Sequence, residues 1–335
     1  MATVGLVGLG LLGGAVASRL HAGGHKVVGF DVLPEKIREL VALGGAGAAS
    51  AADVARASEA VCTLLPSLAS VEEAILGPHG ILAAGRSRQT ILQMSTISPA
   101  LTLRLAREVD GRGGVFVDAP VSGTSAMVAR GEGVILLGGD QAVCERWRAV
   151  LEAIVPRVVH VGAAGQAMVV KLVANLLVAL NTVAAAEALL MAERAGLDPA
   201  RVLEILAGGA GTSRMLDVRG PMIVRREFPA QMKLELFMKD LALITETGEE
   251  VGAPLPLTHV ARQLYGAAQA AGHGGEDLAV VVTALERLSD PSVRARTRFA
   301  GPRPAQSFRG GGFGRGGDPG VHAGGVGGPG WPPSE

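Results

Sequence analysis

The sequence predicts an α/β protein: a doubly wound, mostly parallel sheet followed by an all-helical domain. Up to about residue 162, short apolar runs alternate with helical patterns, which is typical of βαβ units. Beyond that point only helical patterns occur, as far as residue 289. The length of 335 residues fits about two domains at roughly 150 residues each. We therefore predict one domain over 1–162 and a second over 163–289.

Each predicted element follows from its local pattern. The strand candidates are short runs rich in Val and Leu, at 3–7, 26–31, 60–65, 90–95, 115–119, 134–137 and 158–161. Because these runs are apolar on both faces, we expect helices to cover both sides of the sheet. Helical spacing marks segments between the strands, such as 34–43, 99–109 and 141–154, and the segments 163–194, 199–207, 230–251, 256–271 and 275–288 after them.

A glycine-rich tail is expected over residues 290–335. The last 35 residues hold 13 of the 48 glycines and 6 of the 18 prolines, with no apolar periodicity. Such a segment buries too little apolar surface to offset the entropy of ordering, so we predict disorder. An Arg/Gly/Phe tract at 308–317 could bind single-stranded nucleic acid by charge and stacking. We favour a functionless extension instead, because the tract is short.

Composition and charge exclude several classes of function. Lys+Arg and Asp+Glu both number 31, so the net charge is zero and no field favours a nucleic-acid backbone or an anionic membrane. Two cysteines in apolar surroundings, Cys62 and Cys144, fit a reducing compartment. The N-terminus shows no secretory signal, so we expect a cytoplasmic protein. The seven histidines lack metal-ligand spacing, so no metal site is expected.

An apolar stretch at 168–186 resembles a membrane span by composition. It contains Lys171, Asn175 and Asn181 and is followed by Glu187. Polar groups at that density are unfavourable in lipid, so we predict a buried helix rather than a membrane-spanning one.

The strongest motif is GLGLLG at residues 8–13, directly after the first strand. Gly8 permits a tight turn, Gly10 lets the backbone approach a pyrophosphate, and Gly13 lets the following helix pack closely on the strand. The helix start at Leu11 and Leu12 supplies free N–H groups and a favourable dipole. A glycine turn without a ligand is the alternative. The preceding strand, the following helix and a carboxylate about 20 residues later favour a Rossmann dinucleotide site.

That carboxylate is Asp31, at the end of the second strand. A carboxylate there accepts hydrogen bonds from the adenosine ribose and repels a 2′-phosphate, which favours NAD over NADP. Asp31 could also cap the helix that starts at Pro34, and both interpretations are compatible.

Lysine is scarce, with five among the 31 basic residues, and Lys171 lies in an apolar helix. Asn175 lies one turn further along the same face. Burial lowers the pKa of an ammonium group, which suits a proton donor working near neutral pH. The alternative is a lysine whose apolar stem is buried while its amine reaches solvent.

Together these motifs resemble the β-hydroxyacid dehydrogenases, the family of 3-hydroxyisobutyrate dehydrogenase and tartronate semialdehyde reductase. The resemblance covers essentially residues 1–289. It implies that Leu65, Pro66 and Ser70 in the loop after the third predicted strand touch the cofactor. It also implies a nicotinamide-side Thr96 in MSTISP at 94–99, and a cofactor contact by the lysine of KDL at 239–241, Lys239. We interpret the neighbouring Asp240 as a local cap or ion-pair partner.

The resemblance also implies the catalytic arrangement. The motif DAPVSG at 118–123 is similar to the family's substrate motif, so Ser122 and Gly123 would hold a substrate carboxylate. Thr124 departs from the family pattern, and it would add a hydroxyl beside this carboxylate site. Lys171 would exchange a proton with the substrate hydroxyl, and Asn175 would orient the substrate or the lysine. A homodimer or homotetramer is the family expectation, because helix 163–194 is too apolar for water on its outer side.

Two departures from the family pattern concern the substrate side. Ala167 replaces the second glycine of the catalytic motif, and TSAM at 124–127 stands where the substrate motif usually continues with glycine. We interpret these differences as a changed substrate side with the same chemistry. The leading interpretation is an NAD-dependent dehydrogenase of a small β-hydroxyacid. The alternatives are an NADPH-dependent semialdehyde or glyoxylate reductase, and a non-catalytic cofactor-binding scaffold that would not need Lys171 or Asn175.

Overall fold

The computed structural model describes residues 1–289. The predicted tail at 290–335 lies outside the described residues. Nine strands form one sheet: β1 (Thr3–Val7), β2 (Lys26–Phe30), β3 (Ala46–Gly47), β4 (Ala60–Thr63), β5 (Thr90–Gln93), β6 (Val115–Asp118), β7 (Val121–Ser122), β8 (Val134–Gly138) and β9 (Val158–Gly162). Every named strand of the described residues therefore lies between residues 3 and 162.

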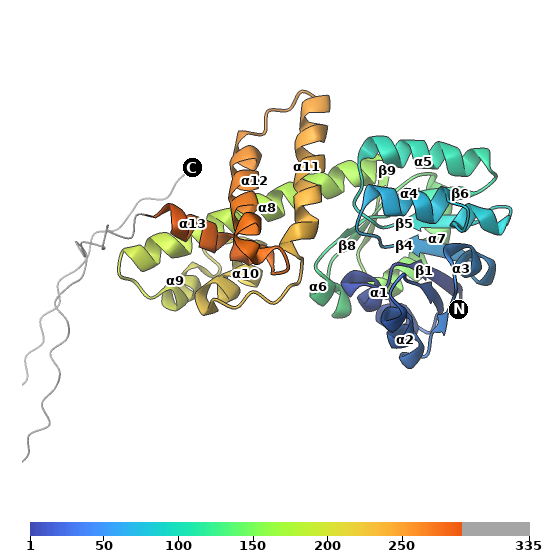
Figure 1. Cartoon of the computed structure of the whole chain (residues 1–335), viewed down its shortest axis with the longest axis horizontal. Coiled ribbons are helices and arrows are strands. Elements are labelled where there is room, and N and C mark those ends of the chain that lie inside the picture. Colours follow the sequence, from blue (N-terminus) through green and yellow to red (C-terminus); the bar gives the residue numbers. More distant parts are fainter. Residues whose placement is uncertain (290–335) are drawn as a thin grey trace, which may run out of the picture. The chain divides into compact units, whose positions relative to one another are not determined.

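Helices connect and follow these strands (Figure 1). The first group is α1 (Leu11–Ala22), α2 (Pro34–Ala42), α3 (Ala51–Ala57), α4 (Leu68–Leu76), η1 (Ile81–Ala84), α5 (Pro99–Gly111), α6 (Ser125–Ala129) and α7 (Gln141–Ile154). The second group is α8 (Gln166–Arg194), α9 (Pro199–Leu206), α10 (Arg214–Arg225), α11 (Leu234–Glu250), α12 (Pro256–Ala268), η2 (Gln269–His273), η3 (Leu278–Val281) and α13 (Val282–Leu288).

The sheet is mostly parallel, with the order β3-β2-β1-β4-β5-β6-β8-β7, and β9 pairs with β8. Strands β6 and β7 pair antiparallel with β8. The chain runs outward from β1 to β2 and β3, then returns to β4 on the other side of β1. This reversal places a topological switch point between the carboxyl ends of β1 and β4, where open α/β sheets bind ligands.

Apolar side chains cover both faces of the sheet. One core cluster packs α1 and α7 against β1, β6 and β8, and includes the fully buried Leu6, Leu20 and Leu151. Another packs α3, α4 and α5 against the strands through residues such as Ile91 and Leu105. The doubly wound α/β fold predicted from the sequence is confirmed.

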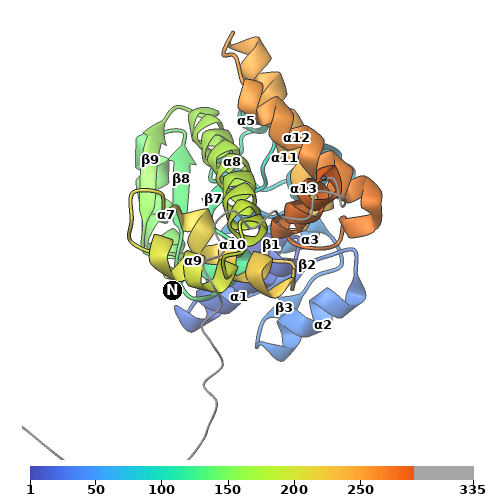
Figure 2. The same ribbon diagram turned by 90° about the vertical axis from the view of Figure 1, so that its left-hand side faces the viewer.

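Helix α8 connects the sheet to the later helices. Its first turns lie beside β8, and its later turns are packed by α9 to α13 (Figures 1 and 2). A further core forms there around Leu189, Phe237 and Tyr265, whose hydroxyl donates to the carbonyl of Ala179 at 3.1 Å. The structure describes no strand after β9, apart from an isolated bridge between Lys233 and Asp277.

The length and apolar composition of α8 would suffice to cross a membrane, and no other described helix meets that criterion. Its polar side chains argue for a helix within a folded protein, since Lys171, Asn175 and Thr182 are all buried against other elements. One stripe remains exposed and apolar, formed by Val169, Val170, Val173, Leu177 and Met191.

The sequence analysis gave no range for seven elements: β3, β7, α3, α4, α6, η1 and α10. Strands β3 and β7 are two residues long and α6 is five, too short for any periodicity to show. Helix α10 was missed for a different reason: Pro221 lies inside it and Gly220 precedes that proline. Gly220 packs against Leu203, since an added Cβ would lie 2.7 Å from a methyl group of that leucine. Tertiary packing therefore stabilises a helix whose local sequence disfavours one.

Candidate active site

The glycine turn between β1 and α1 has the geometry that a pyrophosphate requires. Gly8 has φ +95°, and a Cβ there would lie 2.3 Å from the Leu64 carbonyl oxygen. A Cβ on Gly13 would lie 2.2 Å from the Gly8 carbonyl oxygen, so both positions need glycine. A Cβ on Gly10 would meet nothing within 4 Å, and no side chain caps the start of α1. The first-turn amides at Leu11 and Leu12 thus follow an open, uncapped helix start that fits an anion.

Asp31 fixes this turn from the end of β2. Its Oδ2 accepts a 2.7 Å hydrogen bond from the Leu9 amide, and its Oδ1 accepts one of 2.9 Å from the Leu33 amide. The N-cap residue of α2 is Leu33, so Asp31 forms a turn before the helix and is not its cap. Each carboxylate oxygen keeps a lone pair, so the group can accept further hydrogen bonds from a ribose.

Ser95 joins the two loops that follow β4 and β5. Its hydroxyl donates to the Thr63 carbonyl at 3.1 Å and accepts from the Leu65 amide at 2.8 Å. Gln93 holds the backbone of Ser95 through a 2.9 Å bond from its Nε2 to the Ser95 carbonyl. These bonds link the loop of Leu65 to the segment carrying Thr96. The sequence analysis assigned no role to Ser95, although a serine two residues after a buried strand is a usable signal.

Ser70 lies in the first turn of α4 and forms a capping box with the N-cap residue Ser67. The hydroxyl of Ser67 accepts from the Ser70 amide at 3.1 Å, and the hydroxyl of Ser70 accepts from the Ser67 amide at 3.1 Å. The helix start that Pro66 precedes is thereby fixed. Ser70 therefore has a clear structural role, and its predicted cofactor contact stays a prediction.

The predicted substrate loop starts at β7, where Ser122 pairs with Val134 of β8. A Cβ on Gly123 would lie 3.4 Å from the Cα of Gly133, so the loop packs closely on the segment just before β8. The hydroxyl of Thr124 caps α6 by accepting from the Met127 amide at 3.2 Å. Thr124 still has its hydroxyl proton to donate, and its contact with a substrate stays a prediction.

Lys171 lies on the inner face of α8 and is 6% exposed. Asn175, one turn later, is 4% exposed, and its Nδ2 donates to Oδ2 of Asp240 on α11 at 2.7 Å. Burial lowers the pKa of Lys171 to about 8; the Asp240 carboxylate opposes this shift, and Lys239 adds to it. An amine with this pKa can exchange protons near neutral pH. The alternative of a lysine that reaches solvent does not agree with this burial.

Lys239 on α11 connects the segment that carries Thr96 to the surroundings of Asp240. Its Nζ donates a short hydrogen bond to the carbonyl oxygen of Thr96. Its Nζ also lies 3.0 Å from Oδ1 of Asp240, although that oxygen is without a well-directed hydrogen bond among the described residues. We take this as a charge contact between neighbours. The ion pair between Asp240 and the neighbouring Lys239 agrees with the sequence analysis. The sequence analysis missed the contact with Asn175, because that partner is 65 positions away.

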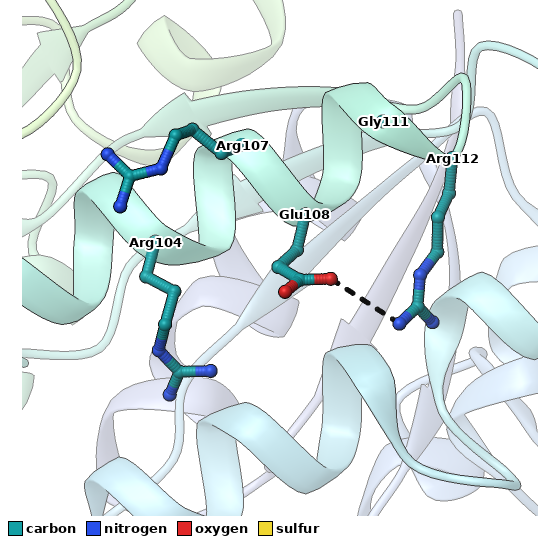
Figure 3. Close-up of a pocket in the computed structure, with 5 residues that line it drawn as sticks. All are labelled: Arg104, Arg107, Glu108, Gly111 and Arg112. Atoms are coloured by element: carbon teal, nitrogen blue, oxygen red, sulfur yellow. Dashed lines mark hydrogen bonds and ion pairs between the residues drawn. The ribbon is translucent and has the colours of Figure 1, made fainter.

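A hollow of about 400 Å³ elsewhere on the surface is distinct from these residues. It is lined by Arg104, Arg107, Glu108, Gly111 and Arg112 of α5 and its end (Figure 3). Arg104 already pairs with Glu72 at 2.7 Å, and Arg112 pairs with Glu108 at 3.5 Å. None of the predicted site residues lines this hollow. Within residues 1–289 no group of three or more His, Cys, Asp or Glu side chains could hold a metal ion.

Comparisons with known proteins agree with this geometry. Residues 3–162 match the family described as the NAD binding domain of 6-phosphogluconate dehydrogenase. Residues 165–285 match the family described as NAD-binding of NADP-dependent 3-hydroxyisobutyrate dehydrogenase. The 2-hydroxy-3-oxopropionate reductase of Escherichia coli K12 is 36% identical over 287 residues, which cover 86% of this chain and 98% of that protein.

A further relative and a solved structure are similar to this chain over most of its length. The 2-(hydroxymethyl)glutarate dehydrogenase of Eubacterium barkeri is 34% identical, over 87% of this chain and 97% of its own. A crystal structure of 3-hydroxyisobutyrate dehydrogenase from Salmonella typhimurium superposes with a TM-score of 0.78 at 30% identity, over 84% of this chain and 99% of that one.

The fold and the site residues define an NAD(P)-dependent oxidoreductase that acts on a CH–OH group. More specifically, the chain belongs to the β-hydroxyacid dehydrogenase family.

Proposed function

We propose that this protein is an NAD-dependent dehydrogenase of a small β-hydroxyacid, with Lys171 as general acid and base. The substrate would be 3-hydroxyisobutyrate-like or 2-hydroxy-3-oxopropionate/glycerate-like, as the names of the relatives suggest. The observation that carries the proposal is the buried Lys171, whose amine has a pKa of about 8 beside the Asn175–Asp240 pair.

The proton and electron balance is simple. When bound, the nicotinamide ring of the cofactor accepts or supplies the hydride at the carbon that bears the hydroxyl. In the oxidative direction the neutral amine of Lys171 takes the hydroxyl proton, and the C–O bond becomes a carbonyl. In the reductive direction the ammonium of Lys171 returns that proton to the carbonyl oxygen. Arginine could not replace Lys171, because its guanidinium stays protonated.

Other residues would bind and orient the substrate. Ser122 and the backbone at Gly123 would hold its carboxylate, with the hydroxyl of Thr124 beside them. Asn175 would present its amide oxygen to the substrate or to Lys171, since its Nδ2 is already bonded to Asp240. Fixing both ends of a small substrate lowers the entropy that remains to be lost in the reaction. Closure around the substrate would exclude water.

Asp31 supports NAD as the cofactor. Its carboxylate is held at the end of β2 by two backbone amides, where it would meet the adenosine ribose and repel a 2′-phosphate. The description of the matching C-terminal family names NADP-dependent enzymes, which keeps NADPH-dependent reduction of a semialdehyde or glyoxylate as the second candidate. A ratio of kcat/KM for NAD over NADP above about ten would support our choice. A ratio below one would overturn it.

The apolar stripe on α8 supports assembly into a homodimer or homotetramer. Val173, Leu177 and Met191 are more than half exposed, and covering such side chains is favourable. Sedimentation equilibrium tests this expectation. We also propose a cytoplasmic location, supported by the two buried free thiols of Cys62 and Cys144.

The decisive experiment measures NADH formation with a panel of small 2- and 3-hydroxyacids, for the wild type and Lys171→Ala. We expect the variant to bind NAD normally and to lose at least about 10²-fold in kcat. Lys26→Ala is the matched control, because Lys26 is exposed at the start of β2. Normal turnover by Lys171→Ala would disprove the acid–base role. If no acid in the panel yields NADH, the scaffold alternative is favoured.

A further inference from the structure

The start of α8 is held to the sheet by one buried carboxylate. Asp118 ends β6 and is fully buried. Its Oδ2 accepts hydrogen bonds from the amides of Gly165 at 3.1 Å and Met168 at 2.9 Å. These two amides lie at the N-cap and in the first turn of α8, where backbone donors otherwise lack partners. One oxygen atom at the end of β6 therefore fixes the position of the helix start along its axis and its rotation about that axis.

Strand β8 makes a second contact with this turn. Gly138 pairs with Asp118 across the two strands. A Cβ on Gly138 would lie 2.8 Å from the carbonyl oxygen of Ala163 and 3.3 Å from the Cβ of Ala167. The helix start therefore approaches the sheet as closely as a glycine allows. Ala167, a departure from the family's glycine pattern, is fully buried at this contact.

The anchored turn leads directly to the proposed catalytic amine. Met168, Lys171 and Asn175 follow each other at intervals of three and four residues and are all buried, so they share one helix face. A straight helix transmits a shift or rotation of its first turn to the next turn almost unchanged. The position of Nζ of Lys171 therefore depends on the bonds that Asp118 makes.

We propose that Asp118 is a positioning residue for Lys171: its carboxylate locks the first turn of α8 against β6 and β8, and so sets where the amine meets the substrate. This inference rests on the proposed function of Lys171. Asp118 does not touch the amine itself. The charges that shift the pKa of Lys171 are Asp240 and Lys239, both on α11, so Asp118 acts through geometry.

The protonation of Asp118 suggests a conservative variant. Burial raises the pKa of this carboxyl to about 7, and the bonds from Met168 and Gly165 only partly oppose the shift. A protonated carboxyl and an amide have nearly the same shape. Asn at this position can still accept both amides through one oxygen, whereas Ala cannot.

The test compares Asp118→Ala, Asp118→Asn and Gly138→Ala with the wild type. We expect Asp118→Ala and Gly138→Ala to lose about 10²-fold in kcat, because a small displacement of a catalytic group is enough for such a loss. Asp118→Asn should stay within about tenfold of the wild type. The Kd for NADH should change by less than about threefold in all three variants, because the glycine turn lies elsewhere.

Two further measurements distinguish positioning from other roles. The midpoint of the kcat/KM–pH profile should stay unchanged in Asp118→Asn, since no charge next to Lys171 is altered. Amide hydrogen exchange at Gly165 and Met168, measured without cofactor, should accelerate in Asp118→Ala. Asp140→Ala is the matched control: Asp140 caps α7 through the Val143 amide at 3.0 Å, so a helix cap is lost while α8 is untouched and kcat stays normal.

The outcomes separate this inference from the proposed function. Normal kcat in Lys171→Ala would overturn the proposed function. Loss of kcat in Lys171→Ala with normal kcat in Asp118→Ala and Gly138→Ala would overturn the positioning role alone. A shifted pH midpoint in Asp118→Asn would also overturn it, since the effect would then be electrostatic. If Asp118→Ala fails to fold, Gly138→Ala decides, because it displaces the same turn and keeps the carboxylate.

Discussion

Asn175 on α8 donates a 2.7 Å hydrogen bond to the carboxylate of Asp240 on α11. Both side chains are almost fully buried, and the two residues are 65 positions apart in the chain. A buried carboxylate in this place has two effects. It fixes the Asn175 amide in one orientation, and its charge partly offsets the desolvation of the nearby Lys171 amine.

Removing the charge of Asp240 is expected to shift the pH profile. In Asp240→Asn, Lys171 loses the carboxylate that raises its pKa, so the pKa should fall further below about 8. We expect the midpoint of the kcat/KM profile to move to lower pH by roughly one unit. Steady-state kinetics across pH 5 to 10 measures this shift. Glu235→Gln is a control, because Glu235 is half-exposed in the first turn of the same helix. An unchanged midpoint in Asp240→Asn would contradict the electrostatic role.

The wild-type enzyme should show opposite pH limbs in its two directions. Oxidation needs the neutral amine of Lys171, so its kcat/KM should rise with pH through a midpoint of about 8. Reduction needs the ammonium, so its kcat/KM should fall through the same midpoint. Measuring both directions with one substrate pair checks that a single group is responsible. Two midpoints more than about one unit apart would require a second titrating group.

Lys171 is expected to lower the free energy of unfolding, although the enzyme needs it for activity. Its pKa is about 8 when folded and 10.5 as a free side chain, so burial of the amine destabilises the fold below pH 10.5, with the full effect below about 8. Lys171→Met should therefore raise the free energy of unfolding by roughly 1–3 kcal/mol at pH 7 while abolishing turnover. The gain should shrink as pH rises from 8 to 10.5, where the amine is neutral in the folded protein and still charged in the unfolded chain, and it should vanish above about 10.5. Urea unfolding at pH 7 and pH 10 measures this, and a gain that does not depend on pH would contradict it.

The glycine turn offers a paired test of cofactor binding. Gly10→Ala adds a methyl group where the structure has free space, at a φ of −64° that alanine adopts readily. The variant should fold normally, yet the KM for NAD should rise by about tenfold or more, because the methyl group would occupy pyrophosphate space. Gly14→Ala is the matched control. Gly14 lies inside α1, and a Cβ there would be 4.0 Å from its nearest neighbour, the carbonyl oxygen of Leu9. Equal KM values for both variants would argue against a pyrophosphate at Gly10.

The sequence predicted the sheet more fully than the site. Strand β1 and helix α7 have the predicted bounds, because apolar runs and helical periodicity are local signals. The glycine turn was also local, since Gly8, Gly10 and Gly13 lie within one turn. Helix α10 was missed because Pro221 and Gly220 disfavour a helix that tertiary contacts impose.

The missing parts of the site are non-local. No pattern around Asp240 shows that its partner is Asn175, and none around Asp118 shows that it holds Met168, 50 positions later. The resemblance to a known family assigned Lys171 and Lys239 to two motifs of that family. Only the fold shows that Lys239 reaches the Thr96 carbonyl. Side-chain partners between distant segments follow from topology, which a single sequence does not specify.

The length of α8 has a mechanical consequence. At a rise of about 1.5 Å per residue its 29 residues form a rod roughly 43 Å long. Such a rod behaves as a lever, and a tilt of about 1° at its sheet end displaces its far end by roughly 0.75 Å. Lys171 lies near the sheet end of α8, so a displacement of the far end of the helix moves its amine by a much smaller distance.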